Sequence, residues 1–323
     1  MQSSLDALAR AHAIPGLALI SIRSGAPSTI LTTGNVCSHP VSAHCITAQT
    51  LFQLASVSKF ISACLVITLA KQKQLDLYQP IDFPDHGTGS GVTVTLAQLL
   101  SHRAGFCRTV GFEGLRRDAG SPQSDLDVTV PCRLSYDVQA IGRYHYSGCH
   151  YWLLQKLLES ELQQSFEQLL QRWLCQPLGL QQTTSIPPGP AQGNVALGHD
   201  LNGQPLPGGW RLFSGVEAAA GLWSSPADLE RLLTSLLVAS SDCDPAAAPL
   251  RLQDLVLNDC TDGYHLGVNV MRTSIGTRFS HWGLNPGYQA ALSLHLGAGR
   301  ASAVLVNRQQ CDAICDLVIR GQI

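Results

Sequence analysis

The sequence predicts a mixed α/β (α+β) fold with two regions, in which one antiparallel sheet is built from both ends of the chain. Short apolar segments rich in β-branched residues lie near the N-terminus and recur toward the C-terminus. Between them runs a longer stretch dominated by helical spacing. We therefore expect a sheet region flanked by helices (residues 1–50 and 211–323) and an inserted, mostly helical region (residues 51–210). The interface between the two regions is where we expect any functional site to lie.

Composition and charge limit the classes of partner. The 323 residues are 45% hydrophobic and 14% charged, which suits one large core or two modest ones. The net charge is −2, and no basic run is longer than Arg116-Arg117. Nothing electrostatic therefore calls for nucleic acid, and small molecules or peptides are the expected partners.

Hydropathy bears on the compartment. No stretch reaches the roughly 18 uninterrupted apolar residues of a membrane span, and the first residues lack the basic-then-apolar layout of a signal peptide. A cytoplasmic protein without a membrane span is expected, although a trimmed leader would leave the same kind of N-terminus. The sequence predicts no oligomeric state.

The cysteines do not form a recognisable framework. Eleven cysteines are scattered without Cys-x-x-Cys pairs, which argues against both a disulfide scaffold and a zinc site. Cys311 and Cys315 would share a helical face, but there is no second pair to complete a metal site. No metal or other cofactor is expected.

The two ends of the chain supply the predicted sheet. At the N-terminus, a helix over residues 4–13 stops at Ile14-Pro15-Gly16, and two antiparallel strands (17–22 and 29–33) follow. The last part of the chain predicts four strands and a closing helix, over residues 264–271, 277–281, 288–296, 301–306 and 311–319.

The middle of the chain reads as helices and loops. Thr95 has the position of a helix cap, and the glycines of residues 87–91 lack a following Lys-Ser/Thr and predict a loop rather than a phosphate site. Residues 106–131 form a long polar loop that we expect to border the pocket. Further features are a helix to about Glu159, a second helix over 165–175, a hairpin turn at Asn202-Gly203, and a helix begun by Ser225-Pro226 and continuing through Leu237.

The stretch with the most chemical content begins at Ser56. Serine is a preferred residue at a helix start, and from Phe60 onward the segment is apolar on nearly every face, as in a buried helix. Lys59 lies one turn after Ser56, so its amine can reach the hydroxyl. A lysine in apolar surroundings loses solvation, which favours the neutral amine and makes it a usable base. Ser56 and Lys59 are thus a candidate nucleophile and base, although Ser-x-x-Lys alone is weak evidence.

A second cluster contains three tyrosines and two histidines within residues 144–151. Without other context, such a cluster is more often an aromatic wall than a catalytic group. The remaining histidines, interpreted as surface or core residues, are His12, His39, His44, His86, His199, His265 and His295.

Three separated motifs in order give the chain a family resemblance. Ser56-Val57-Ser58-Lys59 is similar to the nucleophile motif of the serine β-lactamase and penicillin-binding-protein superfamily. Tyr146-Ser147-Gly148 is similar to its Tyr-x-Asn motif, and His281-Trp282-Gly283 to its Lys-Thr-Gly motif in the His-x-Gly form. The chain most resembles the class C β-lactamase-like branch, which includes esterases and D-aminopeptidases. Flanking segments that agree are residues 14–16, 96–102, 219–222, 226–229 and 285–288.

The resemblance implies a β-lactamase-like fold and an acyl-enzyme on Ser56. Lys59, with Tyr146 as its phenolic partner, would take the hydroxyl proton and pass it to the leaving group. It further implies that the backbone N–H groups of Ser56 and Leu284 form an oxyanion hole. His281 would hold a substrate carboxylate or tune Tyr146, and unlike the family lysine it can be neutral near pH 7.

The sequence departs from the family at Gly148, which stands where the family asparagine would hydrogen-bond a substrate amide. Losing that donor should harm amides and β-lactams more than esters. The expected activity is therefore carboxylesterase-like, on small esters or thioesters. The alternatives are a D-amino-acid peptidase or amidase, a β-lactamase, a peptide-cyclising acyltransferase, or a non-catalytic binding protein on the same fold.

Overall fold

The computed structural model describes residues 2–38, 44–83, 91–106, 126–127, 136–189, 193–241, 250–257 and 262–322. The helices are α1 (Gln2–Ala11), α2 (Val57–Lys71), α3 (Leu96–Leu100), α4 (Gly148–Leu162), α5 (Phe166–Leu170), α6 (Gln176–Leu178), α7 (Pro226–Ser241) and α8 (Asp312–Ile319), with π-helical turns η1 (Gln171–Cys175) and η2 (Glu217–Gly221) and 3₁₀ turns η3 (Leu252–Leu255) and η4 (Leu296–Ala298). The strands are β1 (Gly16–Arg23), β2 (Thr29–Gly34), β3 (Phe52–Gln53), β4 (Ile81–Phe83), β5 (Val92–Val94), β6 (Ala104–Phe106), β7 (Leu126–Asp127), β8 (Tyr136–Ile141), β9 (Phe213–Ser214), β10 (Trp223–Ser224), β11 (Gly263–Tyr264), β12 (Asn269–Thr273), β13 (Gly276–Asn285), β14 (Tyr288–His295) and β15 (Arg300–Val306).

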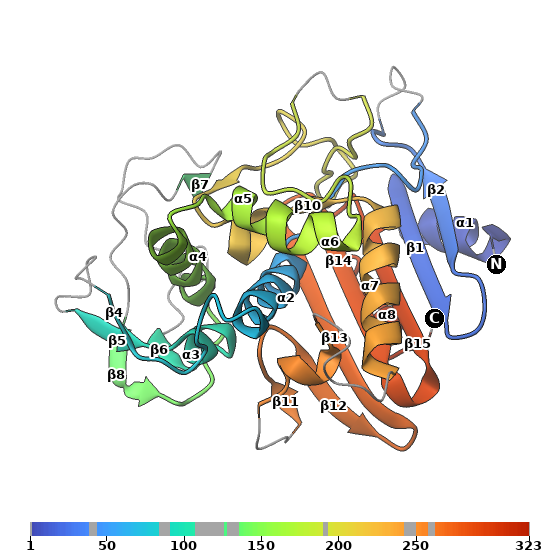
Figure 1. Ribbon diagram of the computed structural model, residues 1–323. Helices are drawn as coiled ribbons and strands as arrows, with labels where there is room; N and C mark the ends of the chain where they lie inside the picture. The colour runs from blue at the N-terminus through green and yellow to red at the C-terminus, as the bar shows by residue number, and fades with distance from the viewer. Residues whose placement is uncertain are drawn as a thin grey trace.

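The main sheet joins the two ends of the chain, as the strand pattern predicts. Its strand order is β11-β12-β13-β14-β15-β1-β2, and every pairing is antiparallel. The first N-terminal strand, β1, lies beside the last C-terminal strand, β15, and the two termini lie close together in Figure 1. The mixed antiparallel α/β architecture expected from the sequence is therefore confirmed.

Helices cover both faces of this sheet. Successive strand residues point to opposite faces, so each strand contributes to two cores. One face, here called the inner face, packs against α2 and α7 in the large core that includes Ile20, Leu292 and Ala303. The other, the outer face, packs against α1 and α8 in a smaller core that includes Leu17, Ala291 and Val304. Figure 1 shows α7 lying across the inner face in front of the strands.

Some predicted elements differ from the observed ones for local reasons. The single strand expected over residues 264–271 is interrupted, because Gly267 adopts a φ of +77° where a Cβ would lie 2.3 Å from the Ala63 Cβ of α2. The expected hairpin at Asn202-Gly203 is a turn with only an isolated bridge, His199 to Pro205. There the Asp200 side chain accepts the backbone N–H groups of residues 202 and 204, which a ladder would otherwise use.

Other elements differ only in extent. The helix begun at Pro226 continues four residues beyond Leu237, to Ser241, and the helix expected over 165–175 changes after Leu170 into the π-helical turn η1. The capping box at Thr95 is present. Most of the loop expected over residues 106–131, and most of the glycine-rich loop over 87–91, lies outside the described residues. The division of the chain into two regions at residues 50 and 210 stays a prediction.

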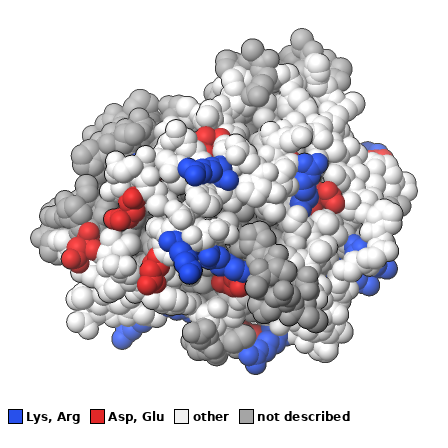
Figure 2. Space-filling model, in the orientation of Figure 1, with Lys and Arg blue, Asp and Glu red and all other residues white. Residues whose placement is uncertain are grey.

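Charges are dispersed on the face of the molecule turned to the viewer. Figure 2 shows basic and acidic side chains interspersed there rather than gathered by sign. Within the described residues, no helix is long and apolar enough to cross a membrane. The same part of the chain holds no group of three or more metal-ligating side chains.

Candidate active site

Ser56 lies where the chain turns from a strand into the most buried helix. It is the N-cap residue of α2, three residues after β3, and its relative exposure is 8%. The preceding residue, Ala55, has a φ of +50°, in the left-handed region that non-glycine residues seldom adopt. This conformation makes the turn into α2 abrupt, and the packed surroundings of Ala55 must hold it in place. The sharp turn puts the Ser56 hydroxyl at the helix start.

Lys59 lies one turn further along α2 and is fully buried. Its Nζ donates to the Ser56 Oγ at 3.0 Å and to the Ala219 carbonyl oxygen at 2.9 Å. Ala219 belongs to η2, and the hydroxyl of Ser62, the next turn of α2, donates to the neighbouring Ala218 carbonyl at 2.9 Å. The contact between Ser56 and Lys59 that helical spacing predicts is thus present, and η2 fixes the direction of the amine.

Tyr146 approaches the same hydroxyl from the segment that precedes α4. Its phenolic oxygen donates to the Ser56 Oγ at 2.9 Å, and its ring centroid lies 4.9 Å from the Lys59 Nζ. The next residue, Ser147, caps α4 by accepting a hydrogen bond from the Cys149 backbone N–H. That cap fixes the start of the helix directly after Tyr146. The side chains of Lys59 and Tyr146, far apart in the sequence, therefore meet at the Ser56 hydroxyl oxygen.

His281 lies near these groups but is bound to a different tyrosine. Its Nε2 lies 3.0 Å from the Tyr264 hydroxyl, and its Nδ1 lies 2.9 Å from the Trp282 carbonyl oxygen. Burial is the main cause that lowers the pKa of His281, to about 3. The imidazole is therefore neutral near pH 7, and the tyrosine that it contacts by hydrogen bonding is Tyr264 rather than Tyr146.

The edge of β13 that carries His281 closes over the start of α2. The pairing of β12 with β13 ends at Ser280, so residues 281–285 form a ladder with β14 only. A Cβ at Gly283 would lie 2.3 Å from the Ser56 backbone nitrogen and 2.9 Å from that of Val57. Only glycine permits this approach. The free edge of β13 is therefore held against the backbone of Ser56.

The remaining predicted site residues are placed differently. Because side chains alternate along a strand, Trp282 and Leu284 point away from the face of β13 that holds His281 and Gly283. Their side chains are 48% and 41% exposed, so in this arrangement only their backbone groups are available to the edge near Ser56. Gly148 is the first residue of α4 and is buried, two residues after Tyr146.

An aromatic cluster lies beneath the site, around His102. This histidine is the last residue of the flanking segment 96–102. The His102 ring lies 4.6 Å from that of Tyr146 and 4.9 Å from those of Tyr264 and His150, between centroids. Burial lowers the pKa of His102 well below its usual value and that of His150 to about 3. The tyrosine and histidine cluster thus supplies Tyr146 to Ser56 and otherwise forms a wall. Nothing in the sequence pattern signals Tyr264, which comes from a short strand distant in the chain.

The close approach at Gly283 should not tolerate a methyl group. We expect Gly283→Ala to lower the rate at which Ser56 reacts with a fluorophosphonate by about 100-fold, because the backbone atoms it would meet must shift. Overpacking should also cost about 1–3 kcal/mol of unfolding free energy, measured in urea. Gly189→Ala is the matched control, since its Cβ would meet nothing within 4 Å. Unchanged reactivity in Gly283→Ala would contradict the contact.

The neutral state of His281 should make folding sensitive to acid. Its pKa is about 3 in the folded protein, whereas an unfolded histidine has a value near 6.5, so the unfolded chain binds the extra proton first. Stability is then full above pH 6.5 and falls as the pH is lowered toward 3. Relative to its value at pH 7, the unfolding free energy of His281→Gln should fall by about 2 kcal/mol less at pH 5 than that of the native chain. The exposed His12 provides the control, and an equal effect of His12→Gln would refute the assignment.

Comparisons with known proteins identify the family of the chain. The sequence family described as Beta-lactamase matches residues 1–316. Penicillin-binding protein 4 of Amycolatopsis lactamdurans is 28% identical over 216 residues, which are 64% of this chain and 54% of that protein. The chain thus matches about half the length of this curated relative.

Solved structures extend the likeness to the whole fold. The class C β-lactamase from Rhodobacter sphaeroides superposes with a TM-score of 0.75 at 19% identity, covering 99% of both chains. SurE, solved with D-Leu, superposes with a TM-score of 0.68 at 25% identity, covering 99% of this chain and 73% of SurE. With a family match over nearly its whole length and the fold of these proteins, the chain belongs to the β-lactamase family, within the serine β-lactamase and penicillin-binding-protein superfamily.

Proposed function

We propose that the protein is a serine hydrolase that works through an acyl-enzyme on Ser56. The observation that carries this proposal is the convergence of two proton-handling groups on one hydroxyl. Lys59 Nζ and Tyr146 Oη lie 3.0 and 2.9 Å from the Ser56 Oγ. A serine hydroxyl is a weak nucleophile on its own and needs an adjacent base within this range.

The burial of Lys59 supports its role as that base. Removal of water works against the charged ammonium, and the neutral amine can accept the Ser56 proton along the same 3.0 Å contact. As Oγ bonds to the substrate carbonyl carbon, the carbonyl electron pair moves onto oxygen. Collapse of that intermediate expels the leaving group, which takes the proton relayed by Lys59 and Tyr146. Water then attacks the ester on Ser56 and restores the hydroxyl.

The negative oxygen of the intermediate needs fixed donors. We assign these to the backbone N–H groups of Ser56 and Leu284, the first at the start of α2 and the second on the free edge of β13. The tight approach of Gly283 to the Ser56 nitrogen supports this assignment, because it brings the two backbone segments together. Donors preset in this way lower the barrier to acyl transfer most strongly in a dry site.

The state of His281 bears on the charge of the substrate. A neutral imidazole, engaged with Tyr264, offers no cation for a substrate carboxylate. We therefore favour substrates without a carboxylate beside the reacting carbonyl. Gly148, which has no amide donor to offer a substrate, further favours small esters or thioesters, so a carboxylesterase-like activity is the leading proposal.

A second candidate is hydrolysis or transfer of D-amino-acid amides and peptides. It is favoured by the likeness to SurE, which has been solved with D-Leu and is 25% identical over nearly all of this chain. A neutral His281 is compatible with such substrates when their carboxylate is blocked. Hydrolysis and acyl transfer differ only in whether water or another nucleophile accepts the acyl group from Ser56.

The first test identifies the nucleophile. A fluorophosphonate should add one label to the native chain and none to Ser56→Ala, read by intact-protein mass. Lys59→Met should slow labelling by about 100- to 10,000-fold, the range expected for loss of a general base. Thr68→Val is the matched control, because it removes another buried hydroxyl from α2, one that donates only to the Cys64 carbonyl within the helix. Labelling that persists in Ser56→Ala would place the nucleophile elsewhere.

The second test separates the substrate classes. On one preparation, kcat/KM should be highest for p-nitrophenyl esters, lower for D-alanine p-nitroanilide and lowest for nitrocefin, which carries a carboxylate. Gly148→Asn should raise the amide-to-ester ratio by up to about tenfold, the worth of one hydrogen bond. Gly148→Ala adds bulk without the donor and should leave the ratio unchanged. A native preference for the anilide would favour the second candidate, and turnover of none of the three, without labelling, would indicate a binding protein.

A further inference from the structure

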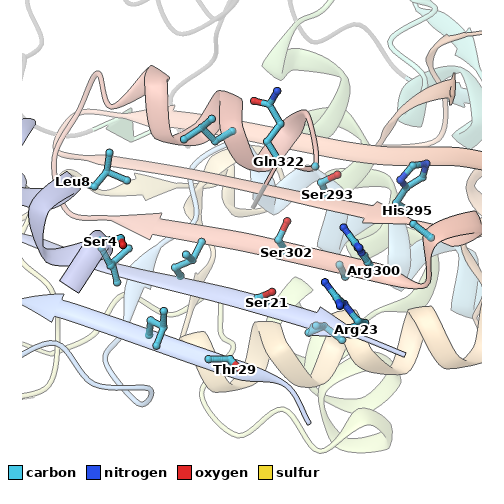
Figure 3. A pocket seen from close by; sticks show the side chains of 18 of the residues that line it. Ser4, Leu8, Ser21, Arg23, Thr29, Ser293, His295, Arg300, Ser302 and Gln322 are labelled. Atoms are coloured by element: carbon cyan, nitrogen blue, oxygen red, sulfur yellow. The ribbon is translucent and has the colours of Figure 1, made fainter. Parts of the chain in front are cut away.

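A cavity lies on the outer face of the main sheet, on the side opposite the Ser56 site. Its volume is about 490 Å³, within the range of small-molecule sites. The sheet forms its floor, and α1, the end of α8 and the η4 turn form its rim. Figure 3 shows side chains from several adjacent strands pointing into it. The catalytic proposal uses none of its lining residues.

The floor of the cavity carries a row of hydroxyls. Ser21 pairs with Ser302, and Ser302 pairs with Ser293, so the three lie side by side across β1, β15 and β14. Figure 3 shows this row directly. Ser293 and Ser302 are 2% and 4% exposed. Within the described part of the chain, no protein group forms a hydrogen bond with any of the three hydroxyls. An apolar floor would be usual under packed helices, whereas these hydroxyls are available to a polar ligand in the cavity.

A row of basic residues crosses the same strands two positions further along. Arg23 pairs with Arg300, and Arg300 pairs with His295, again side by side in Figure 3. Like charges directly opposite each other destabilise a sheet. No Asp or Glu is among the residues that line the cavity. Across the described residues, neither Arg23 nor Arg300 has an ion pair or hydrogen bond that would offset the repulsion. This basic row is therefore suited to bind an anion.

The walls of the cavity are apolar. They are formed by Leu5 and Leu8 from α1, Leu19 and Leu31 from the strands, and Leu317 from α8. A small inorganic anion would satisfy the arginines but leave these walls against water. A ligand with an apolar body and one anionic end satisfies both parts.

We propose that this cavity binds a carboxylate with an aliphatic chain, with its carboxylate at Arg23 and Arg300 and its chain along the leucine walls. The neighbouring serine hydroxyls donate to the same carboxylate. Guanidinium groups suit a carboxylate because their donors match its two oxygens. The site is independent of Ser56, from which the sheet separates it, so it does not rest on the proposed catalytic activity.

Calorimetric titration of the full chain with octanoate tests the proposal. Octanoate should bind, whereas acetate, which lacks the chain, and octan-1-ol, which lacks the charge, should bind at least about tenfold more weakly. Arg23→Gln and Arg300→Gln should each raise the Kd for octanoate by about tenfold, the expected worth of a hydrogen bond to a charged group. Arg10→Gln is the control, since Arg10 is an exposed arginine of α1 that does not line the cavity. Melting temperatures confirm that each variant is folded.

Two further variants are titrated with octanoate to test the cavity itself. Ser302→Ala removes a floor hydroxyl without adding bulk and should also weaken octanoate binding. Ser56→Ala should leave the Kd unchanged. The proposal fails if octanoate does not bind, if Arg10→Gln weakens binding as much as Arg300→Gln, or if Ser56→Ala abolishes it. Tighter binding of inorganic phosphate than of octanoate would overturn the assignment of an aliphatic carboxylate.

Discussion

The burial of one amine beside one alcohol constrains the rest of this structure. Lys59 is fully enclosed, and its Nζ reaches the Ser56 hydroxyl and the Ala219 carbonyl. A buried ammonium or amine is costly unless its hydrogen bonds are satisfied, so both partners must be held in place. The π-helical turn η2 supplies the carbonyl, the left-handed Ala55 supplies the turn at Ser56, and α2 supplies the one-turn spacing. The turn η2, the left-handed Ala55 and the spacing along α2 must all be present for the Lys59 amine to be satisfied beside Ser56.

How far the sequence predicts the site depends on how far apart its parts lie in the chain. Helical spacing alone is enough to predict the contact of Ser56 with Lys59. The position of Tyr146 depends on a long-range approach that only the family resemblance anticipated. The pairing of His281 with Tyr264 was not anticipated at all, because it depends on how β11, which pairs with β12, brings Tyr264 to His281 of β13, and no local pattern encodes that distance. The same holds for strand register, which aligns the arginines and serines of the outer face. Periodicity predicts which residues form strands but not which residues they pair with.

The main sheet has different chemistry on its two faces. On the inner side, the free edge of β13 meets the start of α2, and the neighbouring groups are neutral and enclosed: His281, Tyr264 and His102. On the outer side, β1, β14 and β15 carry arginines and hydroxyls into an open cavity. Successive side chains of a strand point to opposite faces of the sheet, so no side chain contributes to both faces. The chemistry of the inner face and that of the outer face can therefore differ. Substitutions on one face therefore need not disturb the other.

The pairing of β1 with β15 has a consequence for how the protein comes into being. β1 pairs with β2 close by in the sequence, but its other neighbour is β15, so the central contacts of the sheet join segments that lie far apart in the chain. Such distant pairings close slowly, because a long loop must be restrained before they form. Before β15 has been made, the edge of β1 opposite β2 has no partner strand, and the hydrophobic helix α2 has no complete sheet to pack against. A ribosome-bound chain of this protein is therefore exposed to mispairing until β15 has been made, and its reliance on chaperones should be greatest before that point.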